Sequence, residues 1–115
     1  MYFGPTQGIP YTRGMDHVTV FKALSNASRL QILELLRDPE RHFSDHGVLS
    51  RVHECGVCVG AIQEKLGLSQ STVSSYLSLL QRAGLVDATR VGPWTYYRRN
   101  EKTLHALSNY FAAQL

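Results

Sequence analysis

Two segments of helical periodicity follow one another between residues 57 and 83, and only a tight turn separates them. The apolar side chains of the first segment recur at helical spacing, at Val57, Val59, Ile62 and Leu66. Gly67 stands where a helix commonly ends in a left-handed residue. Ser69 is suited to cap the next helix by accepting a hydrogen bond from the backbone N–H of Ser71 or Thr72. The pattern predicts a helix, a tight turn and a second helix, around which the rest of the chain has to pack.

The second of these helices, residues 69–83, separates its apolar and polar side chains. One side carries Val73, Tyr76, Leu77, Leu80 and Ala83, and the other carries Gln70, Ser71, Ser74, Ser75, Ser78, Gln81 and Arg82. The polar side holds no acid, and its four serines are poor choices for an exposed helix interior. Short hydroxyls and amides can approach a DNA groove and bond to base edges, while Arg82 reaches a phosphate. The alternative is a solvated face of indifferent sequence.

A β-hairpin is predicted directly after this unit. Residues 85–91 and 94–99 are rich in β-forming side chains, and a Gly-Pro pair at 92–93 separates them. The hairpin is basic because it carries Arg90, Arg98 and Arg99. Tyr96 and Tyr97 alternate sides of the strand, so we expect one to pack in the core and the other to face outward. A helix-turn-helix followed at once by a basic hairpin is the order of a winged helix, with the hairpin tip beside a neighbouring groove or backbone.

Helices are also predicted on both sides of this unit. The first begins at Asp16, and the second follows closely, with Ser25 or Asn26 as its cap. Residues 40–54 are polar, show no clear period and are predicted to form a loop or an irregular extension. A final helix after a cap at Asn100 carries an apolar stripe at Leu104, Leu107, Phe111 and Leu115. The predicted fold class is mainly α with a β-hairpin wing.

The chain has 115 residues, which is the size of one domain. With 43% hydrophobic and 18% charged residues, it is typical of a folded globular protein. Residues 1–14, rich in glycine and proline, are predicted to be a flexible arm, and residues 15–115 to be the domain. No apolar run approaches the roughly 18 residues that span a bilayer and no signal peptide is evident, so we expect no membrane contact and a cytoplasmic location. The net charge of +3 fits a nucleic-acid partner.

Three blocks of the sequence, FKALSNASRLQILELL, LGLSQSTVSSYLSLLQRAGLV and GPWTYYR, occur in this order within residues 16–115. In order and spacing they resemble the ArsR/SmtB family of bacterial winged-helix repressors. The resemblance implies a homodimer built from the first and last helices, a recognition helix at residues 69–83, and release from operator DNA when an inducer binds. One departure is Tyr76, where many members carry a histidine after the S-T-V-S motif.

The expected function is that of a transcriptional repressor that binds a palindromic operator as a homodimer and is not an enzyme. We expect contacts with double-stranded DNA from the recognition helix and the wing, at Gln70, Ser71, Thr72, Ser74, Ser75, Tyr76, Arg82, Arg90 and Arg98. We expect the dimer interface to include Phe21, Leu104, Leu107 and Phe111. A disulfide-exchange enzyme would need a βαβ pattern that the sequence lacks. A protein-interaction module without DNA binding would be favoured by acids on the polar side of residues 69–83, and these are absent.

Cys55 and Cys58 are the only cysteines of the chain, and three interpretations of them stay open. Metal-responsive family members place a C-V-C-D motif before the recognition helix, whereas residues 58–61 here read C-V-G-A. A thiolate pair still suits Zn²⁺ or another thiophilic metal ion, with further ligands from His42, His46 and His53. Alternatively, the pair is a thiol–disulfide switch, because a helix dipole favours thiolate at a helix N-terminus. In the third interpretation Cys58 fills a core position, Cys55 is incidental, and the inducer is an organic ligand or another signal.

Overall fold

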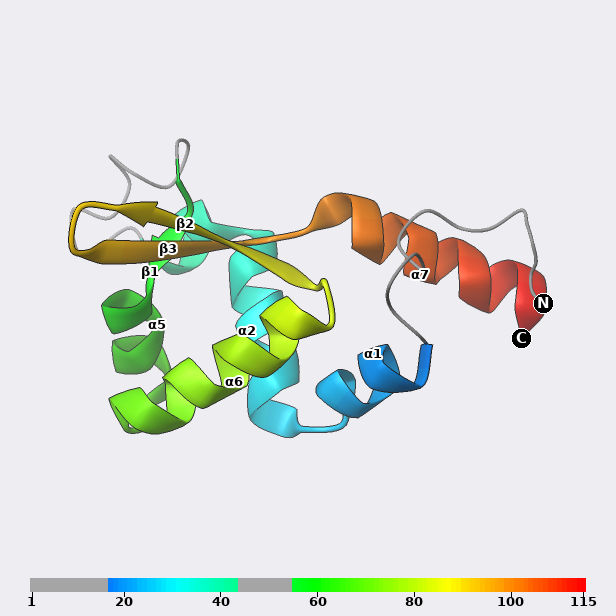
Figure 1. The fold of residues 1–115 in the computed structure, drawn as a ribbon, viewed down its shortest axis with the longest axis horizontal. Helices are drawn as coiled ribbons and strands as arrows, with labels where there is room; N and C mark the ends of the chain where they lie inside the picture. The colour runs from blue at the N-terminus through cyan, green and yellow to red at the C-terminus, as the bar shows by residue number, and fades with distance from the viewer. Residues whose placement is uncertain (1–16, 44–54) are drawn as a thin grey trace.

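The computed structural model describes residues 17–43 and 55–115, so the predicted arm (1–14) and most of the predicted loop (40–54) lie outside the described residues. In chain order the elements are α1 (His17–Leu24), α2 (Ala27–Arg37), α3 (Pro39–His42), β1 (Val57–Cys58), α5 (Val59–Leu66), α6 (Gln70–Arg82), β2 (Val86–Val91), β3 (Trp94–Arg99) and α7 (Glu101–Gln114). In Figure 1 the strands form one layer beside α2, α5 and α6, while α7 runs away from the strands towards α1. This arrangement is a winged helix-turn-helix, as predicted.

The helices begin where the sequence places their caps. Asn26 Oδ1 accepts a hydrogen bond from the backbone N–H of Arg29 at 3.0 Å, and so starts α2. Ser69 Oγ accepts one from the N–H of Thr72 at 3.2 Å, and so starts α6. Between the two helices of the motif, Gly67 is left-handed with φ 70°, which ends α5 as predicted. The two N-caps satisfy backbone N–H groups that the first helical turn leaves without an intrahelical partner. All three signals are local, because each depends on residues within one helical turn.

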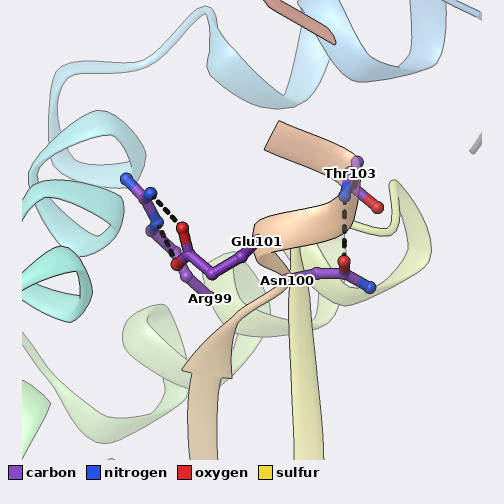
Figure 2. Close-up of polar contacts among 4 residues, drawn as sticks. All are labelled: Arg99, Asn100, Glu101 and Thr103. Carbon is purple, nitrogen blue, oxygen red and sulfur yellow. Dashed lines mark hydrogen bonds and ion pairs between the residues drawn. The ribbon is translucent and has the colours of Figure 1, made fainter. Parts of the chain in front are cut away.

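Asn100 joins the wing to α7 with all of its polar groups. Its N–H donates to Leu85 O at 2.9 Å and its carbonyl accepts from the N–H of Leu104 at 3.1 Å. Its side chain accepts from the N–H of Thr103 at 2.9 Å, as Figure 2 shows, and donates to Asp87 at 3.3 Å. The predicted cap of the last helix is therefore confirmed, and the same residue fixes where the wing ends.

An ion pair lies at the same junction. Arg99 donates to both carboxylate oxygens of Glu101, from Nη2 to Oε1 at 2.6 Å and from Nε to Oε2 at 2.9 Å (Figure 2). The hydrogen bond from Arg99 is the main cause that lowers the pKa of Glu101 below its usual value. The carboxylate therefore stays ionised at neutral pH, at the N-terminus of α7, where the helix dipole favours a negative charge.

Two elements differ from the prediction. Residues 39–42 form the short helix α3 in place of a loop, because Pro39 is suited to a first helical position and its missing N–H costs nothing there. Val57 and Cys58 form the strand β1 rather than the start of α5, which begins at Val59. Gly56 makes this strand possible: its φ is 107°, and an added Cβ would lie 2.3 Å from the carbonyl oxygen of Tyr97.

The sheet has the strand order β1-β3-β2, and both pairings are antiparallel. Val57 pairs with Tyr97, so β1 covers the edge of β3 that the hairpin leaves open. On the side of the helices, apolar side chains form one continuous core, whose fully buried members include Val20, Ile32, Phe43, Ile62, Val73, Leu77, Leu80 and Leu85. The apolar side of α6 packs in this core, and the polar side of the helix is exposed to solvent.

The expectation for the two tyrosines of β3 was wrong in part. Tyr97 is half-buried and packs against the core, as one of the pair was expected to do. Tyr96 lies on the other side of the strand and is nevertheless buried, rather than facing outward. Tyr96 lies in the middle strand of the sheet, where it pairs with Cys58 of the added strand β1 on one side and with Thr89 of β2 on the other.

Candidate nucleic-acid interface

The exposed side of α6 is the largest part of the candidate surface. Its side chains are the ones that the periodicity placed there, and Gln70, Ser71, Ser74, Ser75, Ser78, Gln81 and Arg82 are all exposed. Val73, Leu77 and Leu80 on the opposite side are fully buried. The exposed side is free of acids over the whole length of the helix. This surface of hydroxyls, amides and one guanidinium, beside which Leu79 is also exposed, can therefore approach polyanionic DNA without repulsion.

The hydroxyls at the start of α6 bond to one another. Ser69 Oγ donates to Thr72 Oγ1 at 2.8 Å and lies 3.3 Å from Ser71 Oγ. At the other end of the helix, Arg82 Nε donates to Ser78 O at 3.5 Å, which holds this side chain along the last turn. Gln70 and Ser74 lie between these groups, one helical turn apart on the exposed side. Hydrogen bonds thus link the short hydroxyl side chains at the N-terminus of α6.

Tyr76 differs from the other candidate contacts of α6. It is half-buried and packs against the core instead of lying on the exposed side. The guanidinium carbon of Arg29 in α2 lies 5.3 Å from the centroid of its ring. The structure therefore brings Tyr76 together with α2, and places it apart from Gln70 and Ser74.

The two candidate arginines of the wing lie on opposite sides of the hairpin. Arg90 pairs with Thr95 and Arg98 with Asp87, and residues that are an odd number of positions apart in a strand point to opposite sides. Arg90 lies near the tip, where its Nε donates to Gly92 O at 3.0 Å and stabilises the turn. Arg98 lies at the base of the wing, beside the end of α2. Of the two, Arg90 is the one that lies near the tip of the wing.

Trp94 at the tip of the wing is a further candidate contact that the sequence patterns above did not single out. Its side chain is 60% exposed, although tryptophan is among the more buried residue types. In Figure 1 the tip of the wing and the N-terminal end of α6 lie at the same end of the molecule. The exposure of Trp94 could have been predicted from the sequence, because a residue directly after the Gly-Pro turn of a two-residue hairpin lies at the hairpin tip, away from the core.

Helices α1 and α7 pack through aromatic rings and leave apolar side chains uncovered. His17 stacks on Tyr110 with ring centroids 3.6 Å apart, and Phe21 stacks on Phe111 at 5.6 Å. Phe111 is 46% exposed, and Val18 and Leu115 are exposed as well. Leu107, by contrast, is 5% exposed and belongs to the core of this chain, and Leu104 is half-buried against the core. Of the four expected interface residues, Phe111 therefore offers most surface to a partner.

Cys55 and Cys58 are both free thiols. Cys55 is buried, whereas Cys58 is half-buried, packs against the core and stands at the N-cap position of α5. Within residues 17–43 and 55–115, no three side chains of His, Cys, Asp or Glu come together as a metal site would require. His42 is among these residues, whereas His46 and His53 lie outside them.

A cavity of about 390 Å³ lies at the base of the wing. It is lined by the end of α2, by Gly56 and Val57, and by the junction of β3 with α7. Three carboxylates and two guanidinium groups line it, from Asp38, Glu40, Arg98, Arg99 and Glu101. Its volume is at the lower end of the range for sites that bind small organic molecules.

Comparison with known proteins identifies the family. A family model with the description "Bacterial regulatory protein, arsR family" matches residues 52–88, which span β1, the helix-turn-helix and the start of the wing. An uncharacterized HTH-type transcriptional regulator, YbzH of Bacillus subtilis, is 46% identical over 101 residues, which are 88% of this chain and 100% of the relative. The chain belongs to the ArsR family.

Solved structures with ArsR-type winged helices agree with this assignment. The homodimeric winged helix-turn-helix DNA-binding domain of Mb0332 from Mycobacterium bovis, a possible ArsR-family regulator, is 31% identical with a TM-score of 0.57, covering 84% of this chain and 76% of that one. HlyU from Vibrio cholerae is 26% identical with a TM-score of 0.54, covering 85% of this chain and 91% of that one. This ArsR-family protein is therefore a transcriptional regulator with a DNA-binding winged helix-turn-helix. None of the helices within its described residues is long and apolar enough to cross a membrane.

Proposed function

We propose that this ArsR-family regulator is a cytoplasmic repressor that binds a palindromic operator as a homodimer and leaves it when an inducer binds. The observation that carries the proposal is the acid-free exposed side of α6, held above a fully buried apolar side. Gln70 and Ser74 are suited to bond to base edges in the major groove, and Arg82 to reach a phosphate. Arg90 and Trp94 at the wing tip contact the neighbouring groove or backbone.

The second copy of the chain covers the apolar face of α1 and α7. Val18, Phe111 and Leu115 expose large apolar side chains there, and contiguous patches of this kind mark interaction sites. A two-fold axis through this face relates two α6 helices, which have to lie about 34–36 Å apart to enter successive major grooves. The symmetry of the protein then requires a palindromic operator.

Trp94 provides a direct test of this proposal, because it is the only tryptophan of the chain. We expect its fluorescence to shift to shorter wavelength, and its quenching by acrylamide to fall, when the protein binds a duplex that it has selected from a random-sequence pool. Affinity for that duplex should fall about 10³-fold or more between low and physiological salt, if about six phosphate contacts form. Binding that leaves Trp94 as accessible as before would remove the wing tip from the interface. Failure to select any duplex would contradict the repressor function itself.

We propose Cys55 and Cys58 as the point where the inducer acts. Cys58 stands at the N-cap position of α5 and pairs with Tyr96 of the wing strand, so a change in the position of this residue would act on both elements that flank α6. A few kcal/mol of difference between the two states is enough to release DNA. With peroxide as the oxidant, the two thiols would lose two electrons and two protons to form a disulfide. A thiophilic ion such as Zn²⁺ would instead bind to the thiolates.

The cysteine proposal predicts that Cys58→Ser loses its response to the inducer. Peroxide should weaken binding of the wild type to the selected duplex, dithiothreitol should restore it, and Cys58→Ser should respond to neither. If the inducer is a metal ion, the same variant should lose both the bound ion and its effect in elemental analysis and DNA titration. A Cys55→Ser/Cys58→Ser protein that represses and is released in cells like the wild type would contradict both mechanisms. The inducer would then be an organic ligand or another signal that does not act on these cysteines.

A further inference from the structure

The side chain of Arg29 leaves α2 and contacts two other helices. Its Nε donates to Ala23 O at 2.6 Å and its Nη2 donates to Lys22 O at 3.1 Å, both in the last turn of α1. The same guanidinium lies over the ring of Tyr76, near the middle of α6. One planar group therefore connects the helix of the proposed dimer face with the recognition helix.

The contacts with α1 fix how that helix ends. The last carbonyls of a helix have no intrahelical partner, and a cation near them also complements the helix dipole. Arg29 supplies hydrogen bonds to these carbonyls as well as the cation. In addition, the N–H of Ser25 donates to Lys22 O at 3.2 Å and the N–H of Asn26 donates to Leu24 O at 2.9 Å. The two-residue link between α1 and α2 is thus held by hydrogen bonds at each of its residues.

The contact with α6 is made by a face of the Tyr76 ring. A guanidinium within about 6 Å of a ring centroid is attracted to the ring, and arginine adds stacking of its flat group. Tyr76 is two residues beyond Ser74 in the same helix. The position of the Tyr76 ring therefore also fixes the rotation of α6 about its own axis, which turns Ser74 towards DNA. Arg82 is the one arginine within α6, and it bonds back to its own helix instead.

We infer that Arg29 is a positioning residue, which sets the recognition helix relative to the dimer helix α1 through the ring of Tyr76. The inference rests on the proposed operator binding by a homodimer. Arg29 does not touch DNA in this role. It fixes the relative placement of the two α6 helices in the dimer, and therefore the spacing of half-sites that the protein accepts.

The test compares Arg29→Leu, Tyr76→Leu, Tyr76→Phe and the double variant Arg29→Leu/Tyr76→Leu. The probes are a duplex selected by the wild type from a random pool and the same duplex with one base pair added between its half-sites. Each leucine variant should bind the selected duplex about tenfold more weakly, which is about 1.4 kcal/mol, and the double variant no more weakly than that. Tyr76→Phe keeps the ring and should stay within about twofold of the wild type. The preference of the wild type for the original spacing should shrink in both leucine variants.

Two controls separate positioning from a loss of folding. Sedimentation should show every variant as a dimer. Binding of Tyr76→Leu and Tyr76→Phe to a duplex of unrelated sequence should stay at the wild-type level, because that binding depends on charge and not on helix placement, and these variants keep the charge of the chain. Tyr76→Leu leaves the bonds of Arg29 to α1 in place, so it tests the ring even if Arg29→Leu unfolds.

Additive losses of about a hundredfold in the double variant, or equal losses on related and unrelated duplexes, would overturn the role of Arg29. So would an Arg29→Leu protein that binds and selects spacing like the wild type. A wild type that selects no duplex would instead contradict the proposed function.

Discussion

Replacing Phe111 with glutamate should convert the protein into monomers and lower its affinity for a selected operator by about 10³-fold or more. Phe111 is half-exposed on α7 and stacks on Phe21 of α1, so a second copy that covers this face would bury the new charge without a partner. An unpaired charge in an interface costs several kcal/mol. Without the dimer only one half-site is held, and the advantage of specific over non-specific binding, typically 10³ or more, is lost. Sedimentation velocity and titration of the duplex measure the two effects.

A matched control uses the same helix and the same charge. Asn109 is exposed and lies two residues from Phe111, on the other side of α7, so Asn109→Glu should leave the dimer and its binding intact. Leu107 is unsuited to this purpose, because it is buried in the core of its own chain and a glutamate there would unfold the protein. A Phe111→Glu protein that remains dimeric and bound to the operator would place the dimer face elsewhere.

The double variant Gln70→Ala/Ser74→Ala should lose sequence recognition while it keeps its fold and its charge. Each lost base contact costs about 1–3 kcal/mol, so affinity for the selected duplex should fall between about 30-fold and 10⁴-fold. Both side chains are exposed and alanine favours helix, so the stability of α6 should not suffer. Arg82→Ala should instead weaken binding to all sequences alike.

Footprinting and competition with unrelated DNA measure this loss. The control is Ser78→Ala/Gln81→Ala, which removes groups of the same kind from the C-terminal half of the same exposed side. It should have a much smaller effect, because the N-terminal residues of a recognition helix contact the bases. An unchanged footprint with Gln70→Ala/Ser74→Ala would show that other residues recognise the operator.

Features fixed by neighbours in the sequence could be predicted, and features fixed by distant ones could not. The caps at Ser69 and Asn100 and the left-handed Gly67 depend on one helical turn each and were predicted, and the cap of α2 was narrowed to Ser25 or Asn26, of which Asn26 is the one. The strand β1 exists because the edge of β3 lies beside it, far along the chain, and its two residues fit a helical pattern equally well.

The same distinction holds for the candidate site. The exposed side of α6 follows from its period, so its residues were predicted together. Tyr76 was assigned to DNA from its helix alone, whereas its surroundings depend on Arg29 in another helix. The opposite orientation of Arg90 and Arg98 was predictable, because a two-residue turn at positions 92–93 fixes the register of the hairpin and each strand alternates.

The single residue between the wing and α7 restricts where the length of this protein can change. Asn100 alone separates Arg99 from Glu101, and each residue of an α-helix turns it by about 100°. One residue inserted at this joint would carry Phe111 about a quarter-turn around the axis of α7, away from Phe21. An extra residue at the wing tip would only enlarge a loop. The wing can therefore be lengthened at its tip but not at its junction with α7, because Asn100 fixes the rotation of α7 relative to the wing.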